Sequence, residues 1–292
     1  MGSEIRPRPR TRLLVHKSVL GEWKLLLLDV HEALRGIITH VWYGVGSVAY
    51  ARDRILPRAS SLLLINVGPP QYMVLRGPPE QRVPFTDIWF SGISDTAIDT
   101  EAPLGSAVVG VAFTATGAAT MLRLPPRLTA NQTGSFESLI GTEARSLHQR
   151  LLETPDAVSR LVCVEDFLLR RCLSGSGIHP LVNWASQILA ASGGRVGTRE
   201  LVRESGYSRK HLATLFKEHI GLAPKTVGRI HRFQSALNTI SATDSPDWCR
   251  LALNVGYYDQ AHMINDFRDL SGLTPREISR MARPDANSVV LW

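Results

Sequence analysis

Residues 251–275 read LALNVGYYDQAHMINDFRDLSGLTP, and this pattern indicates how the C-terminal third of the chain folds. Gly256 separates two segments with apolar residues at helical spacing, which is typical of a tight turn between two helices. Asp259 stands at the N-cap position of the second helix. Met263 and Phe267 are four residues apart, so they share the inward face of that helix. The stretch therefore predicts a helix-turn-helix unit.

A second copy of this pattern lies about 50 residues upstream. Residues 206–224 read GYSRKHLATLFKEHIGLAP, with Gly-Tyr, a cap residue, Phe and Gly-Leu-x-Pro in the same order. The offset is 50 residues at the first glycine and 51 from Asp259 onward, because Tyr258 is an insertion of one residue. Ser208 is expected to cap the second helix of this copy. The repeat predicts two helix-turn-helix units in one domain.

The second helix of each unit has a polar outer face suited to DNA. A helix fits the major groove, where Arg and Lys read guanine, Asn and Gln read adenine, and small apolar groups touch the thymine methyl. In the first unit these DNA-binding residues are expected to be Ser208, Arg209, Lys210, Ala213, Thr214 and Lys217. In the second unit they are expected to be Gln260, Ala261, His262, Asn265 and Arg268.

A long helix is predicted between the units, at about residues 225–240. It would hold the two recognition helices apart, so that they could enter major grooves about 34 Å apart along the duplex. Arg229 and Arg232 on this helix are expected to contact the DNA backbone. A helical bundle with simply solvated outer faces is the alternative, but two copies with matching caps and prolines favour DNA reading.

The charge supports a polyanionic partner for the same region. The 292-residue chain has a formal net charge of +7. Residues 180–284 hold 14 Lys and Arg against nine Asp and Glu, a net +5, and residues 1–17 contribute +4. No apolar run approaches the ~18 residues needed to cross a bilayer, and no apolar segment follows the N-terminal charges. A cytoplasmic protein without membrane contact is expected.

The N-terminal half has the pattern of a β-rich domain. From about residue 20 to 113, short apolar runs alternate with Pro and Gly, which is typical of a small barrel or sandwich of antiparallel strands. From about residue 135 the period changes to 3.6 and predicts two amphipathic helices, broken at Thr154-Pro155. Trp42, Tyr43, Trp89 and Phe90 are candidates for an effector pocket, with an ordinary core role as the alternative.

The predicted fold class is therefore α+β, with a small N-terminal β-barrel plus two helices and an all-α C-terminal domain. The expected segments are a flexible basic arm (1–17), a sensor or dimerisation domain (18–173), a Ser/Gly linker (174–178), the DNA-binding domain (179–284) and a tail (285–292).

No catalytic or metal site stands out in the sequence. Residues 18–147 contain only His31 and His40 and no His-x-His pair, so neither a metal nor a cofactor is expected. The chain is interpreted as a non-enzyme. The alternative is a DNA alkyl-repair or modifying enzyme with the same DNA-binding module, which would need a reactive cysteine. Cys163, Cys172 and Cys249 are instead expected to be small buried hydrophobes.

Residues 180–283 resemble the DNA-binding domain of the AraC/XylS family of bacterial transcription regulators. The resemblance rests on the two stretches quoted above, and most strongly on Gly-Tyr, Asp-Gln-x-His, Asp-Phe and Gly-Leu-Thr-Pro in order. It implies binding to double-stranded promoter DNA, with RNA polymerase as a partner if the protein is an activator. The N-terminal half more faintly resembles the cupin-like sensor domains of the family, which implies control by a small-molecule effector or by self-association as a homodimer.

The second recognition helix departs from the family pattern. Asn265 stands where related sequences often carry Arg, and Asp266 and Asp269 make this helix less cationic. It is therefore expected to bind DNA more weakly than the first, or mainly to position the protein.

Overall fold

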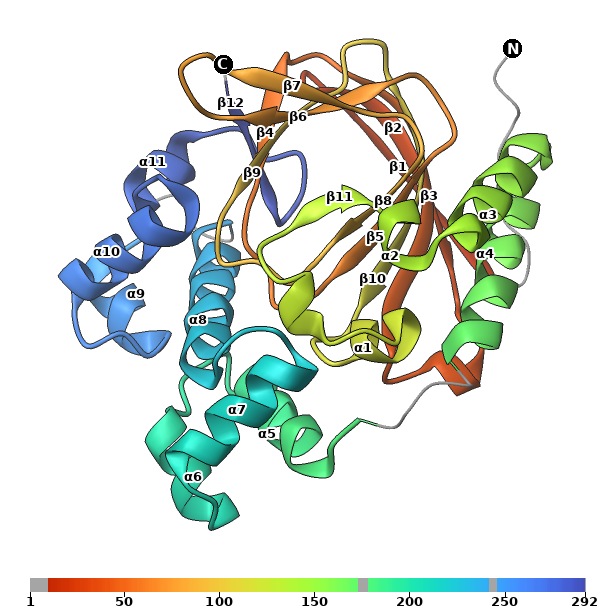
Figure 1. The fold of residues 1–292 in the computed structure, drawn as a ribbon. Helices are drawn as coiled ribbons and strands as arrows, with labels where there is room; N and C mark the ends of the chain where they lie inside the picture. Colours follow the sequence, from red (N-terminus) through yellow and green to blue (C-terminus); the bar gives the residue numbers. More distant parts are fainter. Residues whose placement is uncertain (1–9, 173–177, 242–245, 292) are drawn as a thin grey trace.

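The computed structural model describes residues 10–172, 178–241 and 246–291. A β-rich N-terminal domain, which also contains helices, precedes a helical C-terminal domain (Figure 1). The N-terminal strands are β1 (Thr11–Ser18), β2 (Gly21–Leu28), β3 (Ile38–Val48), β4 (Arg52–Ile55), β5 (Leu62–Asn66), β6 (Gln71–Leu75), β7 (Gln81–Phe85), β8 (Ile88–Ser91), β9 (Ile98–Glu101), β10 (Ser106–Phe113) and β11 (Thr133–Ser135). The helices of this domain are η1 (Glu32–Leu34), α1 (Gly117–Leu122), η2 (Pro126–Leu128), α2 (Glu137–Ile140), α3 (Thr142–Glu153) and α4 (Ala157–Cys172).

The strands form two antiparallel sheets that face each other. One sheet has the order β1-β2-β3-β10-β5-β8-β11, and the other has the order β12-β4-β9-β6-β7, where β12 is Ser288–Leu291. Among the described residues the two ladders do not join, so the predicted small barrel is a barrel-like sandwich that stays open.

The first hydrophobic core lies between the seven-stranded sheet and helices α1, α3 and α4. Alternate residues of the central strands point to the helices, as Val109 and Val111 do on β10, and both are fully buried. Leu147 of α3 and Leu161 of α4 are fully buried against them. Burial of each such aliphatic side chain contributes about 1.5–3 kcal/mol. The predicted break at Thr154-Pro155 is confirmed, but Gly141 divides the first predicted helix into α2 and α3.

The N-terminal segment differs from its predicted form as a mobile arm. Residues 1–9 lie outside the described residues, but Thr11–Ser18 forms β1, which pairs with β2 along its whole length. The ladder satisfies the backbone of the segment, Leu13 packs on the core, and the His16 ring stacks on Trp23 at 3.8 Å. The cationic side chains remain exposed because β1 is an edge strand, where outward charges discourage further pairing.

The C-terminal domain is helical, as predicted. Its helices are α5 (Pro180–Ala191), α6 (Thr198–Ser205), α7 (Arg209–His219), α8 (Pro224–Ser241), α9 (Trp248–Asn254), α10 (Gln260–Ser271) and α11 (Pro275–Arg280). Figure 1 shows α8 between a group formed by α5–α7 and a group formed by α9–α11. Fully buried Phe216, Phe233 and Phe267 fill the core, with the rings of Phe233 and Phe267 4.6 Å apart. The predicted linker at 174–178 falls almost wholly outside the described residues.

The last residues return to the N-terminal domain. The sequence left 285–292 as a tail, whereas Ser288–Leu291 forms β12 and pairs antiparallel with β4. Val289 and Val290 are fully buried, so apolar burial adds to the ladder hydrogen bonds in holding this strand. Strand β12 thus joins the end of the helical domain to the N-terminal domain.

Further contacts join the N-terminal domain to both helix-turn-helix units. The guanidinium of Arg54 on β4 donates to the carbonyl oxygen of Ser271 at the end of α10, at 2.9 Å. Its other face pairs with Asp99, which is 3% exposed. On the other unit, Arg127 of η2 pairs with Glu218 of α7 at 3.2 Å. No helix among the described residues is long and apolar enough to cross a membrane.

Candidate functional site

The first helix-turn-helix unit is α6, a glycine turn and α7. Gly206 has a φ of 72°, which is the left-handed conformation that glycine adopts without strain, and its N–H donates to the carbonyl of Val202. The hydroxyl of Ser208 accepts the N–H of His211 at 3.2 Å, so Ser208 caps α7 as predicted. These local signals set where the recognition helix begins and which of its faces is buried.

The second unit repeats this geometry in α9 and α10. Gly256 makes the turn with a φ of 91°. A carboxylate oxygen of Asp259 accepts the N–H of His262 at 2.7 Å, which confirms the predicted cap of α10. Thr274 and Glu277 form a capping box that opens α11. Helix α9 begins at Trp248 with Asp247 as its cap.

The outer faces of α7 and α10 carry most of the predicted DNA-binding residues. Those exposed on α7 or at its cap are Ser208, Arg209, Lys210, Thr214 and Lys217, while Ala213 is partly buried. Those exposed on α10 are Ala261, His262, Asn265 and Arg268. Gln260 is partly buried, and its carbonyl oxygen accepts from the thiol of Cys249 at 3.2 Å. Cys249 is itself exposed, against the expectation that it would be buried.

Arg229 and Arg232 lie on α8, the predicted helix between the two units, and both have partners inside the domain. Arg229 of α8 pairs with Asp266 at 2.9 Å and with Asp269 at 3.0 Å, both on α10. Arg232 donates to the carbonyl of Gly194 at 2.9 Å and lies over the Tyr257 ring. Both guanidinium groups therefore have partners inside the domain, and their contact with DNA phosphates stays a prediction.

The same contacts change the meaning of the acidic residues on α10. Asp266 is 5% exposed, and its charge faces Arg229 instead of solvent. Asp269 is exposed but shares the same arginine. The two carboxylates are thus partners of α8 that hold α10 in place, and the expectation that they simply make the recognition face less cationic is corrected.

Two exposed tyrosines lie in the turns, and the sequence reading gave them no role. Tyr207 is 50% exposed before α7, and Tyr258 is 85% exposed before α10. Tyr257, which follows the second glycine directly, is buried, so the inserted Tyr258 takes the exposed place. A tyrosine hydroxyl beside a recognition helix can donate to a DNA phosphate. The one-residue insertion was the signal that could have drawn attention to this position.

Two capped helix-turn-helix units with exposed polar recognition faces define a DNA-binding transcription regulator. Residues 201–281 match a helix-turn-helix domain family of the AraC type. A search of curated proteins finds no match.

Parts of the chain are also similar to solved structures. One is the C-terminal domain of AraT, a response regulator from Geobacillus stearothermophilus, at 21% identity, with a TM-score of 0.33 over 37% of this chain and 93% of that one. Another is ToxT from Vibrio cholerae, at 8% identity, with a TM-score of 0.46 over 84% of this chain and 98% of that one.

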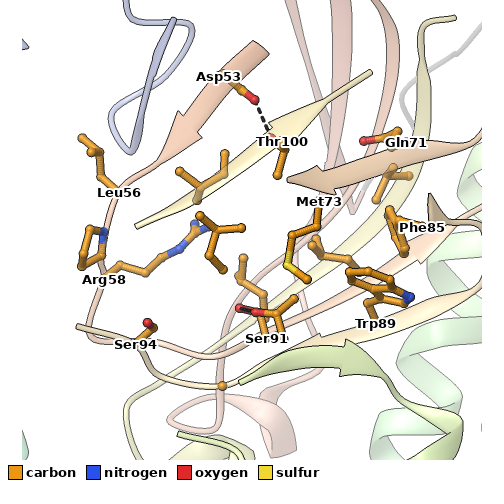
Figure 2. A pocket seen from close by; sticks show the side chains of 18 of the residues that line it. Asp53, Leu56, Arg58, Gln71, Met73, Phe85, Trp89, Ser91, Ser94 and Thr100 are labelled. Carbon is orange, nitrogen blue, oxygen red and sulfur yellow. Dashed lines mark hydrogen bonds between the residues drawn. The ribbon is translucent and has the colours of Figure 1, made fainter. Parts of the chain in front are cut away.

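A cavity of about 360 Å³ lies between the two sheets of the N-terminal domain (Figure 2). Trp42 and Trp89 line it, as predicted, but Tyr43 and Phe90 do not. Neighbouring residues of a strand point to opposite faces, so Tyr43 and Phe90 belong to the core under the helices. The predicted pocket was half right because the sequence did not show which face of each strand met the second sheet.

The cavity also holds charged residues that the sequence reading missed. Asp53 of β4 accepts a hydrogen bond from the hydroxyl of Thr100 (Figure 2). Arg58 lies in the loop after β4, and Asp285 reaches the cavity from the C-terminal tail. Burial raises the pKa of Asp53 to about 6, against the hydrogen bond from Thr100 that lowers it. No local pattern links these three positions, because the fold brings them together from two domains.

Asp53 is expected to make the stability of the protein depend on pH. Its pKa is about 6 in the folded protein, against an ordinary value of 3.8, so the folded state binds more protons than the unfolded state between these values. Its stabilising contribution is therefore complete below pH 4 and is lost as the pH rises through 6. Asp53→Asn should stabilise the protein at pH 8 by at most about 3 kcal/mol, at 1.36 kcal/mol per pKa unit.

Urea unfolding of wild type and Asp53→Asn between pH 4 and 8 measures this effect. Asp29→Asn, which changes an exposed carboxylate of the same domain, is the matched control. If the free energy of unfolding changed with pH in the same way for wild type and Asp53→Asn, this carboxyl group would not titrate in the expected range.

Proposed function

We propose that the protein is a sequence-specific regulator that reads two adjacent major grooves with α7 and α10. The observation that carries this proposal is the pair of capped recognition helices grouped around α8 (Figure 1). The 18 residues of α8 span about 27 Å at ~1.5 Å per residue, close to the ~34 Å repeat of the duplex. Exposed Arg209 and Lys210 suit guanine, and exposed Asn265 suits adenine.

The N-terminal domain is proposed to control this DNA binding, through a small-molecule effector in its cavity or through self-association as a homodimer. Strand β4 supports control by an effector because it contacts the cavity, helix α10 and strand β12. Asp53 and Ile55 line the cavity, Arg54 holds the end of α10, and β12 pairs along the strand. An occupant that shifts β4 would thereby act on the second recognition helix. RNA polymerase is the proposed partner of an activator, and the function includes no catalytic step.

Selection from a random-sequence DNA pool tests the reading of two grooves. The full chain should enrich a motif with two blocks about 10–10.5 base pairs apart, because each recognition helix would enter one groove. Lys210→Ala should relax specificity at a position in one block, and Asn265→Ala at a position in the other. Each lost base contact should cost about 1–3 kcal/mol in discrimination.

The outcome separates this function from its alternatives. Enrichment of a single block would show that only one unit reads sequence. Salt-sensitive binding without any enriched motif would indicate a module that contacts phosphates alone. Arg276→Ala on α11, which removes an exposed cation outside the recognition helices, is the control and should leave both blocks unchanged.

A further inference from the structure

Arg58 is the cation of the cavity between the sheets. Figure 2 shows its side chain extending from the loop after β4 into the space between the sheets. Within the part of the chain that the structure describes, Arg58 has no hydrogen-bond or ion-pair partner. Burial lowers the pKa of Arg58, and the negative charge of Asp285 opposes that effect. Arg58 is partly buried, so its guanidinium is less solvated than that of a surface arginine and can donate hydrogen bonds to an occupant.

The rest of the cavity defines the body of that occupant. Its walls include the aromatic rings of Trp42, Phe85 and Trp89 and the side chain of Met73. Apolar and aromatic walls with a few convergent polar groups are the usual composition of a small-molecule site, and about 360 Å³ falls in the usual size range. A planar guanidinium in such surroundings matches the two oxygens of a carboxylate in a bidentate arrangement.

The two carboxyl groups at the cavity limit the charge of the occupant. Asp53 lies in its wall, and Asp285 stands exposed at its edge. Among the described residues that line the cavity, Arg58 is the one cation, so a ligand with a single negative charge fits the balance better than a dianion.

We propose that this cavity binds a small organic monocarboxylate, with its carboxylate on Arg58 and its apolar body among the aromatic side chains. The inference rests on the proposed function for its regulatory meaning, since it names the chemical class of the effector. Binding itself is independent of DNA. Because Asp285 follows the DNA-binding domain directly and precedes β12, a carboxylate on Arg58 acts on the charge environment of the segment that joins the two domains.

Isothermal titration calorimetry on the full chain without DNA tests the proposal. The probes are 1-naphthoate and octanoate, each paired with its uncharged primary amide, and 1-naphthyl phosphate as a dianion. At least one carboxylate should bind at least tenfold more tightly than its amide, and 1-naphthoate more tightly than 1-naphthyl phosphate. Failure of both acids to bind, or equal affinity of acid and amide, would overturn the proposal.

Variants locate the anion. Arg58→Gln should weaken binding of the carboxylate at least tenfold and leave amide binding nearly unchanged, while Arg58→Lys should retain part of the preference. Arg35→Gln, which removes an exposed cation from the same domain, is the matched control. Asp285→Asn should tighten carboxylate binding severalfold, because it removes a repelling charge, and it serves as a second test if Arg58→Gln lowers the melting temperature. Carboxylate binding that is insensitive to both variants would contradict the assignment.

The result is separable from that of the DNA selection. A selected DNA motif with two blocks and no carboxylate binding would overturn only the inference about the ligand. Carboxylate binding without any selected motif would instead leave the cavity assignment in place and remove the proposed reading of DNA.

Discussion

Arg229→Ala is expected to lower the free energy of unfolding by about 3–5 kcal/mol, the usual cost of removing one partner of a buried ion pair. The carboxylate of Asp266 pairs with Arg229 at 2.9 Å, and its side chain is 7% exposed. Nη2 of Arg232 lies 3.9 Å from the same carboxylate, which is beyond hydrogen-bond distance. The variant would therefore leave a buried charge without its hydrogen-bonded partner between α8 and α10.

Urea unfolding at neutral pH measures this loss. Asp269→Asn is the matched control, because it removes the exposed partner of the same arginine and should cost less than about 1 kcal/mol. The salt dependence of DNA binding gives an independent readout. A variant that stays stable while its slope of log affinity against log salt falls by about one unit would show that Arg229 contacts a phosphate after all.

The double variant Arg209→Ala/Lys210→Ala is expected to weaken binding to the selected DNA site by about 100-fold or more. Each base contact in the major groove contributes about 1–3 kcal/mol of discrimination, and both side chains project from the first turn of α7. Both are exposed, and alanine is the best helix former, so the melting temperature should stay nearly constant. Affinity for the selected site and for a scrambled site is measured at one fixed salt concentration.

A control of equal charge distinguishes base reading from general attraction. Arg276→Ala/Arg280→Ala removes two exposed cations from α11 in the same domain. It should weaken binding to the selected and scrambled sites by similar, smaller factors. If the two double variants weakened binding equally at every site, α7 would supply only charge, and the proposed reading of bases by this helix would be wrong.

The helix-turn-helix units were predictable because their signals are local. Ser208, Asp259 and Thr274 cap helices within three residues of themselves, and Gly206 and Gly256 adopt backbone conformations that favour glycine. Each signal depends only on residues close in sequence, so it can be recognised without knowing the rest of the fold. The exposed faces of α7 and α10 follow from the same helical periodicity.

The long-range partners were not predictable in the same way. Arg229 reads as a free cation on a polar helix face, and only the packing of α8 on α10 brings Asp266 to it. Trp42 and Tyr43 are adjacent aromatic residues whose roles the sequence does not distinguish. The packing of the two sheets makes Trp42 a wall of the cavity and Tyr43 a residue of the core. The terminal residues read as a tail because a four-residue strand has no stable form until β4 accepts it.

From its sequence alone, this chain can be read as two capped helix-turn-helix units behind a β-rich domain. Turn and cap energies act between residues a few positions apart, and helical and strand periods repeat along the chain. The lining of the cavity between the sheets, the pairing of Arg229 and the return of the C-terminus to the N-terminal domain arise from tertiary structure. They depend on which surfaces of the helices and sheets are buried against one another. The free energy of that burial is set by contacts between segments distant in the chain.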